Sequence, residues 1–267
     1  MKLYTAIVTE EEGRAALALP PYRVLCSYWC FRKNIDLVKG YIASDYELFL
    51  DSGAYSAANT GAPIDMEDYI AYINESGAML YAGLDVIGDP ITTMRNIKTM
   101  EERGLHPIPT FHMGGDPKDL RALFDYPYIA LGGMVFSTGR ERYCDEIWNI
   151  LLKEAPGIHV HGFGMANIAL MERYPWFSVD TSSWKDGRRF GKPKMLWHDM
   201  KMMQVKKWDF EKYIIAMGYK LEGLEPKEIR YIWDFLGAQS YKQYAGYLDA
   251  LNKIKSFDYL KQQTKMF

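Results

Sequence analysis

One pattern recurs along this chain: a short apolar run typical of a buried strand ends in an acid or a glycine. The runs and the residues that follow them are 48–50 before Asp51, 79–84 before Asp85, 128–131 before Gly132 and Gly133, 158–161 before Gly162, and 176–179 before Asp180. In a parallel α/β barrel the carboxyl ends of all strands lie at one face, where the following loops assemble the active site. A single aspartate at such an end is more often a helix cap or a turn residue, but three at matching ends favour a site.

The spacing of these runs predicts an α/β fold, a (β/α)8 TIM-like barrel with a helical C-terminal extension. Eight candidate strands lie at 3–8, 22–29, 47–50, 79–84, from His106, and at 128–131, 158–161 and 176–179. Helices between them are expected to start at Asp65, at Asp89 before Pro90 and at Asp116 before Pro117. Because acids end strands all along the chain and not at one point, a barrel is favoured over an open doubly wound sheet.

The length of 267 residues, 48% of them hydrophobic, suits one barrel with an appendage. We assign residues 1–215 to the catalytic barrel, including a basic loop at 184–208, and residues 216–267 to helices packed on it. The sequence has no apolar run of bilayer length and no signal-peptide core, which predicts a cytoplasmic protein without a membrane partner. Its three cysteines form no CxxC pair and no zinc pattern, so we expect buried thiols and no metal.

One stretch is strongly basic in a chain whose formal net charge is only -2. Its candidate contacts to a nucleic-acid backbone are Trp184, Lys185, Arg188, Arg189, Lys192 and Lys194. Basic side chains with aromatic side chains between them can neutralise phosphates and stack on bases. The alternative is a solvated loop with ordinary surface lysines.

The order of five short motifs resembles that of the tRNA-guanine transglycosylases, which exchange guanine for a 7-deazaguanine without cutting the backbone. The segment 51–55, Asp-Ser-Gly-Ala-Tyr, resembles the Asp-Ser-Gly-Gly-Phe motif of that family. Gly114-Gly115 resembles its Val-Gln-Gly-Gly loop, 131–134 its Gly-Gly-Leu segment, and 162–164 its Gly-Val-Gly turn. Asp180 stands in order where the family has its nucleophile. Any one of these motifs alone would be weak.

Two departures from the family pattern affect the expected acceptor. The tRNA enzymes carry a zinc site of three cysteines and a histidine after the nucleophile, whereas this chain has no cysteine after Cys144. Met113 stands where the family has the glutamine of its base-recognition loop. A compact chain without the zinc module is more similar to the branch found in bacteria and their phages, which inserts 7-deazaguanines into DNA. DNA is therefore favoured over tRNA as the partner, together with a free 7-deazaguanine base.

Base exchange needs two acids with different tasks, because the sugar develops positive charge while the base leaves. Asp180 is the expected nucleophile and Asp51 the expected general acid and base. The resemblance implies that Asp85 accepts the donor groups of a guanine-like base, with Gly132 and Gly133 offering backbone groups and Tyr55 or Phe163 stacking on it. The other members of the expected base-binding set are Ser52, Gly53, His112, Met113, Gly114 and His161. No cofactor is expected, and a homodimer remains open.

Three rival functions are retained. The histidines 106, 112, 159, 161 and 198, with the three aspartates, could serve a metal-dependent barrel hydrolase. The metal content of the purified protein distinguishes that function from base exchange. The second rival is a transglycosylase that acts on tRNA. The third is a catalytically silent barrel that binds nucleic acid, which would show binding without exchange of guanine.

Overall fold

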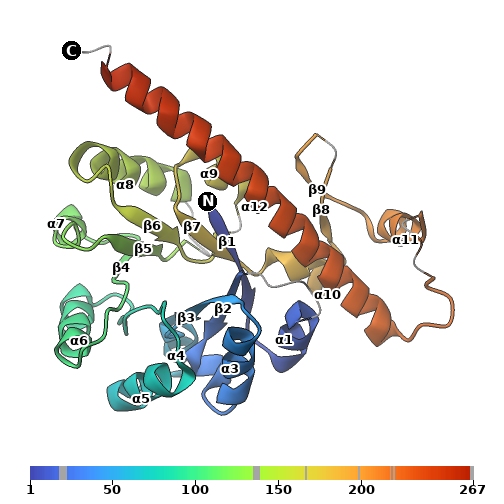
Figure 1. The fold of residues 1–267 in the computed structure, drawn as a ribbon, viewed down its shortest axis with the longest axis horizontal. Coiled ribbons are helices and arrows are strands. Elements are labelled where there is room, and N and C mark those ends of the chain that lie inside the picture. The colour runs from blue at the N-terminus through green and yellow to red at the C-terminus, as the bar shows by residue number, and fades with distance from the viewer. Residues whose placement is uncertain are drawn as a thin grey trace.

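The structure is a computed structural model, and it describes residues 1–17, 23–134, 139–165, 167–197, 199–216, 218 and 220–264. Its centre is a seven-stranded sheet of order β3-β2-β1-β7-β6-β5-β4, which curls so that one face is concave (Figure 1). All neighbouring strands in it run parallel. The strands are β1 (Lys2–Ile7), β2 (Arg23–Ser27), β3 (Glu47–Asp51), β4 (Thr110–His112), β5 (Tyr128–Gly132), β6 (His159–Gly162) and β7 (Ser178–Thr181).

The segment expected to be the fourth of eight strands, 79–84, forms only isolated bridges. Leu50 in β3 bridges Tyr81, and Ala82 bridges Ile108 shortly before β4, both in parallel orientation. The Leu50 N–H donates to Leu80 at 2.9 Å, and the Gly83 N–H to Ile108 at 2.8 Å. A Cβ on Gly83 would lie 1.9 Å from the Ile97 side chain, so the glycine allows the next helix to press closely on this segment. The fold is therefore α/β with a curled parallel sheet.

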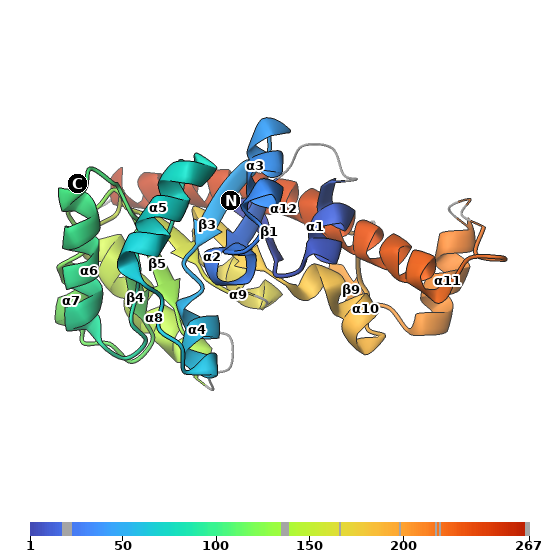
Figure 2. The ribbon, with the colours of Figure 1, turned by 90° about the horizontal axis from the view of Figure 1, so that it is seen from below.

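Helices follow most strands and cover the convex face of the sheet (Figures 1 and 2). In the first part of the chain they are α1 (Glu10–Leu17), α2 (Tyr28–Phe31), α3 (Ile35–Ala43), α4 (Ala54–Thr60), α5 (Met66–Ser76), α6 (Pro90–Glu102) and α7 (Pro117–Arg121). The later ones are α8 (Arg140–Glu154), α9 (Ile168–Arg173), the 3-10 turn η1 (Ser183–Lys185), α10 (Asp186–Phe190), α11 (Lys207–Ala216) and α12 (Pro226–Thr264). The expected N-caps are confirmed, since Asp65, Asp89 and Asp116 each accept a backbone N–H of the first helical turn.

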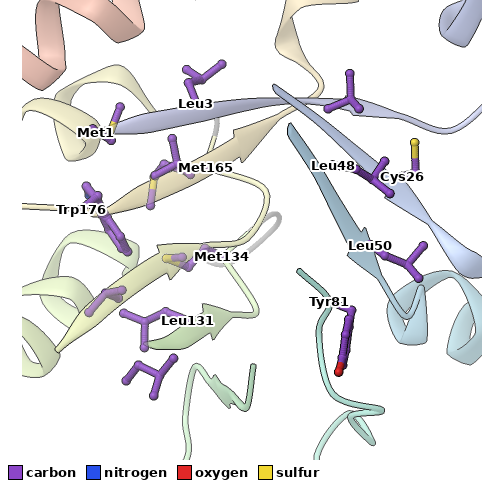
Figure 3. Packing of buried hydrophobic residues seen from close by; sticks show 14 of the residues in the cluster. Met1, Leu3, Cys26, Leu48, Leu50, Tyr81, Leu131, Met134, Met165 and Trp176 are labelled. Atoms are coloured by element: carbon purple, nitrogen blue, oxygen red, sulfur yellow. The ribbon is translucent and has the colours of Figure 1, made fainter. Parts of the chain in front are cut away.

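In β1, β2, β3 and β5, alternate residues enter two different apolar clusters, as expected for a parallel sheet that is buried on both faces. Tyr4, Leu25 and Phe49 belong to the cluster inside the curl. Their neighbours Leu3, Cys26, Leu48 and Leu50, with Leu131 and Trp176, belong to the larger cluster between the sheet and the helices (Figure 3). Cys26 and Cys144 are buried and Cys30 is partly buried, all three as free thiols.

The long helix α12 packs against β1, α1, η1 and α10. The amino group of Met1 pairs with Asp249, and the Tyr244 hydroxyl donates to Glu172 at 2.6 Å. A Cβ on Gly237 would lie 2.1 Å from the Trp184 carbonyl oxygen, so α12 approaches the backbone of η1 closely. Through β1, the C-terminal helix α12 therefore packs on the sheet.

The elements between β7 and α12 extend beyond one side of the sheet (Figure 2). They include α10, α11 and an antiparallel hairpin of β8 (Lys194–Leu196) and β9 (Met202–Gln204). Across the described part of the chain, no helix is both long enough and apolar enough to cross a bilayer.

Candidate active site

Three aspartates gather at the carboxyl ends of the strands. Asp51 is the last residue of β3, Asp85 follows the bridged segment, and Asp180 lies in β7. Burial and, to a lesser extent, the charges of Asp85 and Asp180 raise the pKa of Asp51 to about 8, although the N–H groups of Gly53 and Ser52 oppose the rise. At neutral pH Asp51 is therefore mostly a protonated acid beside two other carboxyl groups.

Asp180 is buried, and one of its oxygens is held by two protein groups. Oδ1 accepts the Gly164 N–H at 2.8 Å and lies 3.3 Å from Nε2 of His161. Within the described residues, Oδ2 has no hydrogen-bond partner. The carboxylate is thus fixed at one oxygen, while the other can meet an incoming group.

His161 lies beneath Asp180, inside the curl of the sheet. Its ring is fully buried, 4.7 Å from the Phe49 ring and 4.6 Å from the Phe163 ring. Nδ1 is hydrogen-bonded to Ser178 Oγ, so both ring nitrogens have protein partners. Burial lowers the pKa of His161, although Asp180 opposes this. The structure therefore places this predicted base-binding residue where it supports Asp180, with no nitrogen left for a base.

Asp85 is held by two side chains that the sequence also predicted for the site. Its Oδ2 lies 2.8 Å from Nε2 of His112, and its Oδ1 accepts the Ser52 hydroxyl at 3.1 Å. A Cβ on Gly132 would lie 2.8 Å from Nδ1 of His112. We expected Gly132 to allow close approach of a base, whereas in the structure its missing side chain makes room for the imidazole that binds Asp85.

A tight turn fixes Asp51 at the end of β3. Gly53 has a φ of 80°, and a Cβ there would lie 2.3 Å from Ser27 Oγ and 2.5 Å from Trp29 Cβ. Only glycine fits both this backbone conformation and this space. Tyr55, two residues further on in α4, is 51% exposed.

The remaining members of the predicted base-binding set lie close to these groups. Met113 donates its N–H to the Gly132 carbonyl at 3.1 Å, and a Cβ on Gly133 would lie 3.2 Å from the Met113 side chain. Gly114 is exposed, with a φ of 89°. Phe163 packs on Phe49 with ring centroids 5.6 Å apart, which makes it part of the inner core more than a free stacking surface.

The basic stretch divides into a buried and an exposed part. Trp184 and Lys185 are buried, which corrects their predicted role as surface contacts to a phosphate backbone. Lys185 Nζ pairs with Glu12 Oε2 at 2.7 Å, and Trp184 Nε1 donates to the Ala6 carbonyl at 3.1 Å. Glu12 was not predicted as a functional or structural partner; it lies with Glu10 and Glu11 in the first turn of α1.

The exposed part of the basic stretch is smaller than the sequence suggested. Arg189 and Lys192 are exposed, and Lys194 is partly buried and pairs with Asp186 at 3.2 Å. The side chain of Arg188 lies outside the described residues. Among the predicted backbone contacts whose side chains are described, Arg189 and Lys192 are therefore the ones that can meet a phosphate. Lys194 is already paired with Asp186.

The histidines considered for a metal do not cluster in the described structure. His159 stacks on Phe177 with centroids 3.7 Å apart, and His106 is exposed, while His198 lies outside the described residues. Among the side chains that the structure describes, no three histidine, cysteine, aspartate or glutamate residues come together as metal ligands.

The site thus consists of Asp51, whose pKa is raised, and two nearby carboxyl groups, Asp85 and Asp180, each hydrogen-bonded to its own histidine. Such a set can transfer a proton and present a nucleophilic oxygen in the same reaction. Compared with known proteins, the chain matches no family model and no curated protein. The functional assignment therefore depends on the residues themselves.

Proposed function

We propose that this protein is a base-exchange glycosyltransferase that replaces guanine in nucleic acid with a 7-deazaguanine through a covalent bond between Asp180 and the sugar. The observation that carries the proposal is the placement of Asp51, Asp85 and Asp180 together at the carboxyl ends of the strands, where the pKa of Asp51 is raised to about 8. Two carboxyl groups in different environments are what a glycosidic exchange requires. The order of motifs resembling those of the tRNA-guanine transglycosylases gives independent support.

The first step breaks the bond between the sugar and guanine. Asp180 Oδ2 bonds to the anomeric carbon as the glycosidic electron pair leaves with the base, and the Asp51 carboxyl gives its proton to the departing guanine. In the second step the Asp51 carboxylate takes the ring N–H proton of a 7-deazaguanine. The base nitrogen then displaces Asp180 from the sugar. The exchange needs no cofactor, because the bond between Asp180 and the sugar keeps the anomeric carbon reactive toward the incoming base.

Asp85 is proposed to recognise the base. Guanine and 7-deazaguanine both present N–H donors on the Watson–Crick edge, and a carboxylate accepts two of them at once. His112 and Ser52, which bind Asp85 at 2.8 and 3.1 Å, would hold it in the required orientation. The exposed Tyr55 is the better candidate for stacking, because Phe163 is already packed on Phe49.

We also propose that the sheet belongs to a complete (β/α)8 barrel. The bridges from Leu50 to Tyr81 and from Ala82 to Ile108 connect the region of β3 to that of β4, the two edges of the seven-stranded sheet. Residues 81 and 82 would then represent the eighth strand. Closure explains why Asp51 and Asp180, on strands separated by β1 and β2 in the sheet, meet Asp85 at one mouth.

DNA is the favoured acceptor, since the resemblance without the zinc module is to the DNA-modifying branch. The alternative acceptor is tRNA, and in either case the partners would be a nucleic acid and a free base in the cytoplasm. The exposed Arg189 and Lys192 provide the charge for a phosphate backbone.

The test is to incubate the protein with a 7-deazaguanine and either guanine-containing DNA or tRNA, followed by mass spectrometry of the nucleosides. The proposal predicts a 7-deazaguanine nucleoside in DNA that is absent with Asp180→Asn. Incorporation into tRNA alone would assign the acceptor to the rival transglycosylase. Unchanged nucleosides with both acceptors, under conditions where the protein binds them, would contradict the proposed function.

A further inference from the structure

We infer that His161 is a positioning residue that holds Asp180 through a buried hydrogen-bond chain running from Tyr128 through Ser178. The chemical role of Asp180 in this inference rests on the proposed function. The series of hydrogen bonds itself follows from the positions of the described residues. Tyr128 is hydrogen-bonded to Ser178, Ser178 to Nδ1 of His161, and Nε2 of His161 lies 3.3 Å from Asp180 Oδ1.

Strand register explains why these groups meet. Tyr128, His161 and Ser178 come from the neighbouring strands β5, β6 and β7, and His161 pairs with Ser178 in the register of β6 and β7. Ser178 and Asp180 are two residues apart in one strand, so their side chains share a face about 7 Å apart along it. The imidazole opposite them therefore spans the gap, with one nitrogen toward each residue.

The identity of the partners fixes the direction of each hydrogen bond. An ionised Asp180 only accepts, so Nε2 of His161 carries the proton and Nδ1 accepts the Ser178 hydroxyl. Ser178 Oγ in turn accepts the Tyr128 hydroxyl. The pKa of Tyr128 is raised by burial and that of His161 is lowered by burial, which keeps the phenol a donor and the imidazole neutral. All four groups are thus satisfied by one arrangement of protons.

This arrangement distinguishes the two oxygens of Asp180. Oδ1 accepts from Gly164 N–H and from His161, so Oδ2 is the oxygen that bonds to the sugar. In the resulting ester Oδ1 is the carbonyl oxygen, and it keeps both hydrogen bonds. No proton has to move along the chain, so His161 acts by orientation alone.

Nuclear magnetic resonance of the full-length protein labelled with ¹⁵N-histidine tests the chain without any substrate. The His161 signals, identified by their loss in His161→Gln, should show protonated Nε2 and unprotonated Nδ1 at neutral pH. Ser178→Ala should shift the Nδ1 signal, because that nitrogen loses its donor, while Nε2 stays protonated toward Asp180. His159→Gln, a control on the same strand, should leave the His161 signals unchanged. A wild-type ring with protonated Nδ1, or with both nitrogens protonated, would overturn the inference.

Kinetics then test the effect on Asp180. Ser178→Ala should lower kcat by about 10²-fold with little change in KM for the free base, because a displaced nucleophile slows the bond-forming step while the Asp85 region is untouched. Tyr128→Phe should have a smaller effect in the same direction. A Ser178→Ala protein with a shifted Nδ1 signal and an unchanged kcat would contradict positioning by His161. The expected tautomer in a protein that exchanges no base would refute the proposed function alone.

Discussion

Asp51 has a raised pKa and lies near two other carboxyl groups, Asp85 and Asp180, and its burial has a measurable cost to stability. Its pKa is about 8 in the folded protein, against about 3.9 for an unfolded aspartate. Between these values the folded protein binds a proton that the unfolded chain does not. The contribution of Asp51 to stability is therefore fully present below about pH 4 and is lost as the pH rises to 8.

Asp51→Asn should remove the loss of stability that the wild type shows as the pH rises, because asparagine does not ionise. Relative to the wild type, the free energy of unfolding of the variant should rise between pH 5 and pH 8 by up to about 1.4 kcal/mol for each pH unit. Urea unfolding at several pH values measures it. Asp125→Asn, at an exposed position, is the matched control and should show no such trend. An equal difference between Asp51→Asn and wild type at pH 5 and pH 8 would contradict the raised pKa.

Gly132→Ala tests the support of Asp85. The added Cβ would lie 2.8 Å from His112 Nδ1, so the imidazole must move and its hydrogen bond to Asp85 weakens. We expect about tenfold weaker binding of a free 7-deazaguanine, measured by calorimetry, since hydrogen bonds to charged groups contribute about 1.5–3 kcal/mol. Gly157→Ala, where nothing lies within 4 Å of the new methyl group, should bind like wild type. Equal affinity for both variants would exclude this role of His112.

For single residues, the sequence predicted that Asp51, Asp85 and Asp180 lie near one another. It did not predict the hydrogen bond that His161 makes to Asp180. Asp51, Asp85 and Asp180 were found because parallel strands end at one face whatever their register. The task of His161 could not be found, because it depends on the register that pairs it with Ser178. Lys185 was mistaken for a surface charge because its partner, Glu12, lies at the other end of the chain, and no local pattern encodes that contact.

At the scale of elements, local signals were sufficient for most helices and strands. The caps at Asp65, Asp89 and Asp116 start α5, α6 and α7, because an aspartate before a helix satisfies its free N–H groups. The helices α1 and α4 were missed. In α4, Asn59 and Thr60 complete the helix although Asn favours turns, and Gly61 ends the helix in the left-handed conformation. Tertiary packing outweighed the local preference there.

The contact between α12 and η1 is predicted to limit the stability of the C-terminal helix. Gly237→Ala would place a methyl carbon 2.1 Å from the Trp184 carbonyl oxygen, so α12 must shift. Gly246→Ala lies in the same helix with nothing within 4 Å, so it gains only helix propensity. We expect Gly237→Ala to be less stable than Gly246→Ala by about 1–3 kcal/mol in urea unfolding. Equal stabilities would mean that α12 does not press on η1.

At the scale of the whole molecule, the surface beside α10 is expected to bind the nucleic-acid backbone. Each phosphate neutralised releases counterions, so affinity falls with salt at a slope of about 0.9 per contact. Replacing the exposed Arg189 and Lys192 with Ala should weaken DNA binding and reduce that slope by about two contacts, while affinity for the free base stays unchanged. Binding to labelled DNA at several salt concentrations measures it.

The matched control for this surface removes two exposed lysines from the outer helices α6 and α8, Lys98 and Lys153. That variant has the same net charge as the Arg189 and Lys192 variant, so a general charge effect would act on both equally. If the two double variants show the same salt slope, the basic stretch is an ordinary solvated loop and the backbone is bound elsewhere around the site.

The most direct test of base exchange through Asp180 is to identify the covalent intermediate. The wild type is mixed with guanine-containing DNA and a 7-deazaguanine, denatured and digested, and the peptides are analysed by mass spectrometry. We predict a sugar-linked peptide whose modification maps to Asp180, and a loss of both adduct and exchange of at least about 10³-fold in Asp180→Ala. An adduct on another residue, or an Asp180→Ala protein that exchanges bases at the wild-type rate, would contradict the account.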